Sequence, residues 1–101
     1  MVLLKNLLED TRMFLAKAAK VGFDWQEIQP VWDKLAEEII ELRIAIEDNN
    51  QTEIEAEVGD IIFTIVNLSR FLKVDAEVAI NMTNKKFIDR FSYVENEVND
   101  S

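Results

Sequence analysis

The sequence predicts an all-α protein in which four helices form one bundle. It contains 2 Gly and 1 Pro among 101 residues, which is too few for the many turns of a β-sandwich or barrel. Apolar residues recur at every third or fourth position through most of the chain, the spacing of one face of a helix. Because a chain of this length forms one domain, we expect residues 1–101 to make a single unit.

The first helix is expected over about 3–20, where leucines recur at helical spacing and Gly22 follows the last turn as a stop signal. Asp24, with a glutamate three residues later, has the spacing of a capping box for the next helix. Phe23 and Trp25 flank this cap. Aromatic residues at such a junction most often pack in a core, but they also offer a stacking surface to a flat ligand.

The second helix is expected over about 28–48. Its apolar residues step by three and four and form one continuous stripe: Ile28, Trp32, Leu35, Ile39, Leu42 and Ile46. Ile40 and Ile44 lie on the opposite face. A helix that is apolar on two faces needs a second partner, so we expect oligomerisation to complete the bundle.

The third helix is expected over about 52–72, and its stripe consists of Ile54, Val58, Ile61, Ile65, Leu68 and Leu72. Beyond Asp60 this helix is apolar nearly all round, which predicts burial. One polar line remains along it, formed by Glu57, Asp60, Thr64 and Asn67. Asp75 is placed to cap a fourth helix, and residues 96–101 are expected to be a frayed tail.

Two acidic pairs stand out in the middle of the chain. Glu38 with Glu41 and Glu57 with Asp60 are each spaced i, i+3, which puts both members on one helix face, about 5–6 Å apart at Cβ. The polar stretch 48–52 reads as a turn, so the two helices should be antiparallel and the pairs should face each other. A carboxylate on a mostly apolar helix is costly unless it is paired or bound to metal. The pattern predicts a site for a hard divalent cation.

Composition limits the chemistry and the partners. The chain has no Cys and no His, which excludes disulfides, thiolate chemistry and the usual zinc ligands. A net charge of −9 disfavours binding of nucleic acid polymers. No apolar run is long enough to span a membrane and no secretory signal is recognisable, so a cytoplasmic protein is expected.

The fourth helix carries the basic cluster Lys85, Lys86 and Arg90. If this cluster lies near the carboxylates, the site would suit hydrolysis at a phosphate. Alternatively, the three cations are solvated charges on the protein surface.

Two other functions fit the same residues. In a chain with 20 acidic residues, such spacings also arise on a solvated helix face, and the protein would then be a non-catalytic helical interaction module. A nucleotide sensor that binds without turnover is the third possibility.

Five blocks of the sequence resemble MazG-type nucleoside triphosphate pyrophosphohydrolases. The run 34–42 (KLAEEIIEL) resembles their Glu-Glu-x-x-Glu signature, and 57–63 (EVGDIIF) resembles their Glu-x-x-Asp segment. Residues 22–25, 66–72 and 84–91 continue the match in the family's order. The resemblance spans about residues 21–95, which is most of the chain, and it implies that the core of the domain lies there. It is far more specific than the acidic motif alone.

The resemblance implies a MazG-like bundle that works as a homodimer or homotetramer. It implies hydrolysis of (deoxy)nucleoside triphosphates between the α and β phosphates, which gives a nucleoside monophosphate and pyrophosphate. The expected role is house-cleaning of the nucleotide pool. The cofactor would be Mg²⁺, with Mn²⁺ as a substitute, bound by four carboxylates: Glu38, Glu41, Glu57 and Asp60.

The resemblance also assigns supporting roles. Glu37 would help the metal ligands, and either Glu38 or Glu41 would be the general base. The substrate-binding positions would be Lys86 and Arg90 for the triphosphate, Asn67 and Asn84 for the nucleotide, and Phe23 and Trp25 near the base or sugar. Longer members of the family carry two such domains, whereas this chain has one, and the preferred base is left open.

Overall fold

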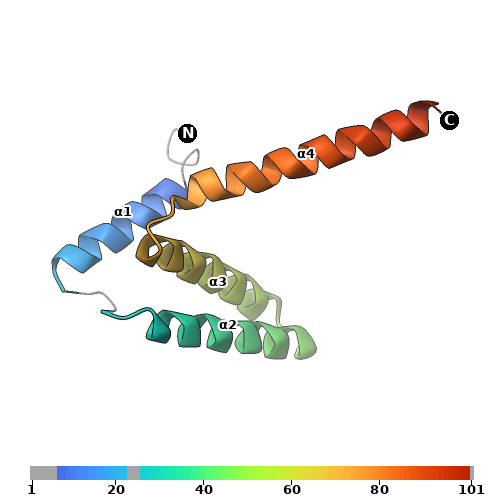
Figure 1. Cartoon of the computed structure of the whole chain (residues 1–101). Coiled ribbons are helices and arrows are strands. Elements are labelled where there is room, and N and C mark those ends of the chain that lie inside the picture. Colours follow the sequence, from blue (N-terminus) through green and yellow to red (C-terminus); the bar gives the residue numbers. More distant parts are fainter. Residues whose placement is uncertain (1–6, 23–25, 101) are drawn as a thin grey trace.

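The computed structural model describes residues 7–22 and 26–100, which form four α-helices and contain no strand. These helices are α1 (Leu7–Lys20), α2 (Gln29–Glu47), α3 (Gln51–Phe71) and α4 (Ala76–Asp100) (Figure 1). The all-α prediction is confirmed, and the boundaries of α2 and α3 differ from the expected ones by one residue. Phe23, Asp24 and Trp25 lie outside the described residues, and so does the predicted capping box; Ile28 is the N-cap of α2.

A three-residue connection folds α2 and α3 into a hairpin. Asn49 adopts a left-handed backbone with φ of 53°, a conformation that Asn tolerates better than most residues. The side chain of Asn50 then caps α3 by accepting a hydrogen bond from the backbone N–H of Glu53 at 3.2 Å. Because the connection is short, α2 and α3 lie side by side along their lengths (Figure 1).

The face of α2 that is buried differs from the predicted stripe. Trp32 and Ile39 are nearly half exposed, whereas Val31, Glu38 and Ala45 are buried. These three residues are seven positions apart, so they form one line along the helix. This line carries two smaller apolar side chains, and the larger apolar residues of the predicted stripe are exposed or half-buried.

The prediction that α3 is buried on all sides is wrong for a single chain. Ile62, Phe63 and Ile65 are about half exposed. The buried residues of α3 instead include three from the predicted polar line together with two apolar neighbours: Glu57, Thr64, Val66, Asn67 and Leu68. The second half of α3 therefore buries two polar side chains together with two apolar ones and leaves several larger apolar side chains in solvent.

The fourth helix leaves the rest of the molecule. Asp75 caps it, as predicted, because its Oδ1 accepts hydrogen bonds from the backbone N–H groups of Glu77 at 2.9 Å and Val78 at 3.4 Å. The beginning of α4 lies near α1 and the end of α3, and the helix then runs away from the hairpin (Figure 1). Every residue from 77 to 98 is exposed. One chain alone therefore does not close the bundle, and its completion by oligomerisation, expected from the sequence, stays a prediction.

Helix α4 continues to Asp100, and the frayed tail expected over 96–101 stays a prediction. No Gly or Pro follows Asp75, so nothing in the sequence stops the helix before its end. None of the four described helices is apolar over a sufficient length to cross a membrane.

Candidate metal centre

Three of the four carboxylates predicted to bind metal meet between α2 and α3. Glu38, Glu41 and Glu57 each place one carboxylate oxygen within 4.8 Å of the others. Glu38 is 3 % exposed, Glu57 is 8 % exposed and Glu41 is half-buried. Asp60 is exposed and lies outside this group. The spacing of Glu38 and Glu41 on one helix face, together with the short turn, brings the three oxygens together.

Lys34 holds Glu38 in place. The Lys34 Nζ atom lies 2.9 Å from Glu38 Oε1, and the two residues are spaced i, i+4 on α2. This hydrogen-bonded ion pair lowers the pKa of Glu38 and raises the pKa of Lys34. Glu38 is therefore ionised at neutral pH despite its burial. The sequence analysis missed Lys34, although its spacing from Glu38 is a standard signal for an ion pair on a helix.

Glu57 keeps its proton to a much higher pH. The adjacent Glu38 carboxylate is the main cause, and burial and the nearby Glu41 add to it, so the pKa of Glu57 is raised to about 7. The second oxygens of Glu38 and Glu57, both named Oε2, are buried without a hydrogen-bond partner among the described residues. A buried acceptor without a partner is uncommon in a stable fold and indicates a missing ligand or ion.

These residues fit a divalent cation. Carboxylate oxygens are the ligands that Mg²⁺ and Mn²⁺ prefer, and here two of them are buried and unpartnered. A cation would also take the place of the proton that Glu57 retains, because metal ligands bind in their deprotonated form. Three converging carboxylates that pair with one cation among the described residues, Lys34, are otherwise an unfavourable arrangement.

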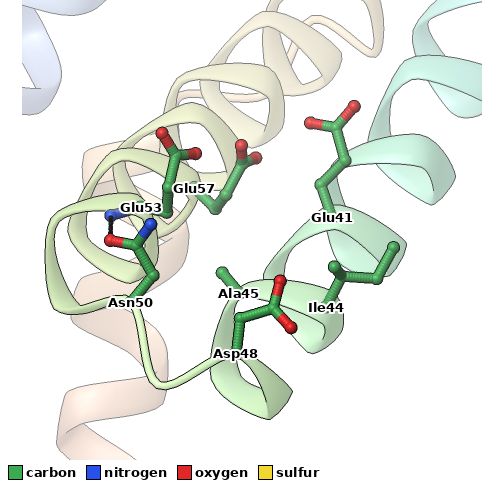
Figure 2. Close-up of a pocket in the computed structure, with 7 residues that line it drawn as sticks. All are labelled: Glu41, Ile44, Ala45, Asp48, Asn50, Glu53 and Glu57. Atoms are coloured by element: carbon green, nitrogen blue, oxygen red, sulfur yellow. Dashed lines mark hydrogen bonds between the residues drawn. The ribbon is translucent and has the colours of Figure 1, made fainter.

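A pocket opens beside these carboxylates, near the turn of the hairpin. Its volume is about 380 Å³, and it is lined by Glu41, Ile44, Ala45, Asp48, Asn50, Glu53 and Glu57 (Figure 2). The sequence analysis did not select Asp48 or Glu53. Their spacing could have identified them. Asp48 follows Glu41 by seven residues and Glu53 precedes Glu57 by four, and both spacings put the two residues on the same face of a helix. Four carboxylates make the pocket strongly negative.

Two other predicted residues of the hairpin lie apart from this pocket. Glu37 is exposed, with its carboxylate 4.0 Å from Lys34 Nζ. Asn67 is buried, but its Oδ1 accepts two hydrogen bonds from Arg70, at 3.3 Å from Nε and 3.1 Å from Nη2. Asn67 also lies ten residues after Glu57, or roughly 15 Å along α3.

The predicted residues of α4 are not brought to the carboxylates of the same chain. Asn84, Lys86 and Arg90 are exposed on the part of α4 that runs away from the hairpin (Figure 1). Phe23 and Trp25 lie outside the described residues. The structure thus places three of the four predicted metal ligands together and the predicted cations of α4 elsewhere.

Comparisons with known proteins agree with the sequence motifs. A family model described as MazG nucleotide pyrophosphohydrolase domain matches residues 26–94. Two curated relatives are similar to this chain. One is the nucleoside triphosphate pyrophosphohydrolase/pyrophosphatase MazG of Thermotoga maritima, which is 43 % identical over 88 residues that cover 87 % of this chain and 33 % of that protein. The other is the nucleoside triphosphate pyrophosphohydrolase of Escherichia coli K12, 46 % identical over 83 residues that cover 78 % and 31 %. The chain spans about a third of the length of these relatives.

Proposed function

The chain belongs to the MazG nucleotide pyrophosphohydrolase domain family, and from this premise we propose that it hydrolyses nucleoside triphosphates between the α and β phosphates. The products would be a nucleoside monophosphate and pyrophosphate. The observation that carries the proposal is the group of three carboxylate oxygens within 4.8 Å of one another, contributed by Glu38, Glu41 and Glu57. The names of the curated relatives support the same activity.

The cofactor in this proposal is Mg²⁺, with Mn²⁺ as a substitute. When bound, such an ion neutralises phosphate charge and makes water a better nucleophile at neutral pH. Glu38, Glu41 and Glu57 would hold it. Asp60 remains a candidate fourth ligand, because its i, i+3 spacing from Glu57 puts it at the neighbouring position on α3.

Glu38 and Glu41 have different roles in the proposed reaction. Lys34 fixes Glu38 at 2.9 Å, which suits Glu38 to a ligand role. Glu41 is half-buried and lines the open pocket, so it is better placed than Glu38 to accept the proton of the attacking water. The water oxygen forms a bond to phosphorus, its proton passes to Glu41, and the bond to the leaving pyrophosphate breaks.

The biological setting forms part of the proposal. The substrates would be (deoxy)nucleoside triphosphates in the cytoplasm, and removal of non-canonical or surplus nucleotides would be the role. Nothing in the described pocket selects one base, so each canonical or modified nucleoside triphosphate is a candidate substrate.

The proposal also includes a homo-oligomer, either a dimer or a tetramer. The buried apolar side chains of the described residues are Val31, Ala45, Val66 and Leu68. In contrast, many large apolar side chains are exposed on all four helices. Stable monomers rarely expose this much apolar surface, and a second copy of the chain would cover it.

A product assay tests the function. The protein is incubated with Mg²⁺ and each canonical or modified nucleoside triphosphate, and monophosphate, diphosphate and pyrophosphate are quantified. We expect monophosphate and pyrophosphate in equal amounts, and Glu57→Gln should abolish both. The matched control is Glu55→Gln, because Glu55 is exposed on the same helix and only accepts a hydrogen bond from Gln51. Tight nucleotide binding without product would instead identify a sensor.

A further inference from the structure

A second pocket lies where α1, the end of α3 and the start of α4 come together (Figure 1). Its volume is about 300 Å³, and it is lined by Arg12, Arg70, Lys73, Val74 and Asp75. The cations come from three places in the chain: α1, the last turn of α3 and the link to α4. Arg70 lies thirteen residues after Glu57, or roughly 20 Å along α3, so this junction pocket is separate from the carboxylates.

The guanidinium of Arg70 is held in a fixed orientation. Its Nε and Nη2 atoms donate hydrogen bonds to Asn67 Oδ1 at 3.3 and 3.1 Å, and Asn67 is buried. The guanidinium also lies over the ring of Phe71, 5.0 Å from its centroid. Its N–H groups form a planar fork that matches the oxygens of a phosphate group. An anion in the pocket would therefore meet a cation that is already oriented, and little side-chain entropy would be lost on binding.

Lys73 occupies a backbone position that does not favour lysine. Its φ is 57°, and two hydrogen bonds fix it there: its N–H donates to the carbonyl of Arg70 at 3.1 Å, and the N–H of Val74 donates to the carbonyl of Ser69 at 2.9 Å. This is the Schellman motif, whose left-handed residue is usually Gly and sometimes Asn. The α2–α3 turn has the same pattern of bonds, with Asn49 at that position. A lysine here costs conformational energy, which its charge in the pocket would offset.

The charges that line the junction pocket are only partly neutralised by described residues. Lys73 forms no ion pair or side-chain hydrogen bond with any of them. Arg12 reaches Glu9 at 4.0 Å, but these side chains are 46 % and 42 % exposed, so the pair is weak. Asp75 also lines the pocket, but its Oδ1 already accepts hydrogen bonds from the first backbone N–H groups of α4. Among the described residues, the pocket is therefore positive in a chain whose net charge is −9.

We propose that the junction pocket binds a compact phosphate polyanion of the pyrophosphate class through Arg12, Arg70 and Lys73. Phosphate oxygens suit the guanidinium fork, and several charges on one small ligand can meet cations from three parts of the chain at once. A monovalent ion would leave most of this charge unmatched. The ligand would join α1, the end of α3 and the link that leads to α4. The inference stands without the proposed function, because this binding requires neither the carboxylates nor hydrolysis.

Calorimetric titration of the full chain with sodium pyrophosphate tests the site. Metal ions are removed beforehand on a chelating resin, so that no cation holds pyrophosphate at the carboxylates. We expect saturable binding, and Arg12→Ala should weaken it about 10-fold or more, because a charge-assisted hydrogen bond is lost. The matched control is Arg43→Ala, since Arg43 is exposed on α2 and does not line the pocket. Absence of binding by the wild type, or equal binding by the two variants, would overturn the proposal.

Two further substitutions separate charge from folding. Lys73→Asn removes the cation but supplies the residue found at the equivalent position of the α2–α3 turn. The free energy of unfolding should therefore not fall, whereas pyrophosphate affinity should drop. Asp75→Asn retains a good N-cap residue and removes the acid from the pocket, so affinity should rise. A decrease in affinity for Asp75→Asn, or unchanged affinity for Lys73→Asn, would overturn the proposal.

A series of anions identifies the ligand class. Orthophosphate and sulfate should bind at least about 10-fold more weakly than pyrophosphate, because each carries fewer charges to share among the cations. Equal affinities for sulfate and pyrophosphate would mean that the pocket attracts anions without selecting a polyphosphate, and would overturn the assigned class. If pyrophosphate binds at the junction pocket and no nucleoside triphosphate is hydrolysed, the proposed function fails and the junction pocket stands.

Discussion

The α2–α3 hairpin and α4 have similar amphipathic patterns, but the hairpin buries part of its surface whereas α4 is almost entirely exposed. The three-residue turn at 48–50 returns α3 against α2, and residues of both helices become buried. The link from α3 to α4, residues 72–75, is one residue longer, but Lys73 takes a left-handed backbone with φ of 57° and α4 points away (Figure 1). An amphipathic pattern therefore predicts burial only when the chain supplies the partner. The two regions also differ in charge, because the buried acids lie on the hairpin, whereas Lys86 and Arg90 lie exposed on α4.

The largest expected effect comes from removing a buried acid of the hairpin. Glu38→Gln should reduce hydrolysis by at least about 100-fold, which is the upper range for losing only an outer-shell partner of a metal. Mn²⁺ affinity, measured by calorimetry, should fall with it. Glu47→Gln, an exposed acid on the same helix, should leave both values near the wild type. Equal effects of the two substitutions would mean that burial of Glu38 has no functional meaning.

The next effect is on α4 and concerns association. Phe87, Phe91 and Val94 form an exposed apolar stripe along α4. Phe91→Asp places a charge in this stripe, so the self-association constant should fall by at least about 30-fold, the factor for an interface residue worth about 2 kcal/mol. Sedimentation velocity over a concentration series measures it. Ser92→Asp adds the same charge at an exposed neighbour outside the stripe and serves as the control. An unchanged association constant for Phe91→Asp would show that the stripe is not an interface.

The third effect is the pH dependence of the metal-free hairpin. The pKa of Glu57 is raised to about 7, so between the pKa of the unfolded chain, 4.5, and about 7 the folded state binds more protons than the unfolded state. The free energy of unfolding should therefore fall as pH rises through this window. Urea titrations in a chelator from pH 5 to 8 measure the trend. Glu57→Gln should flatten it, and a rise in stability over the same range would contradict the assignment.

The smallest effects distinguish the two regions through their helix caps. Asn50→Ala and Asp75→Ala each remove a side-chain cap, a loss of about 1 kcal/mol. For Asn50 this loss should appear in urea unfolding at every protein concentration. For Asp75 it should appear as weaker association and lower α4 helicity, because α4 has few contacts within its own chain. Circular dichroism and sedimentation together separate the two results.

The sequence predicted local features of the fold well. Helix boundaries follow from apolar spacing, and the Asp75 cap follows from residue type. The acidic pairs were also expected to face each other, and Glu38, Glu41 and Glu57 do so. Each of these features depends on residues a few positions apart or on a single turn, which is the range over which sequence patterns are informative.

Features that depend on neighbours in space were not predicted. Spacing identifies the faces of a helix but not the surface that each face meets, so the exposure of Trp32 and Asp60 could not be foreseen. The direction of α4 depends on the backbone of Lys73, which no periodicity encodes. The role predicted for Lys86 and Arg90 remains a prediction.

The short turn between α2 and α3 also has a consequence for how the chain folds. Contacts across this hairpin join residues close in sequence, and local contacts form quickly, on the microsecond-to-millisecond scale of small helical proteins. Most of α4 has no such contact, so its docking awaits an encounter with another molecule and depends on concentration. Refolding should therefore show a fast phase that is independent of dilution and a slower phase whose rate falls as the protein is diluted.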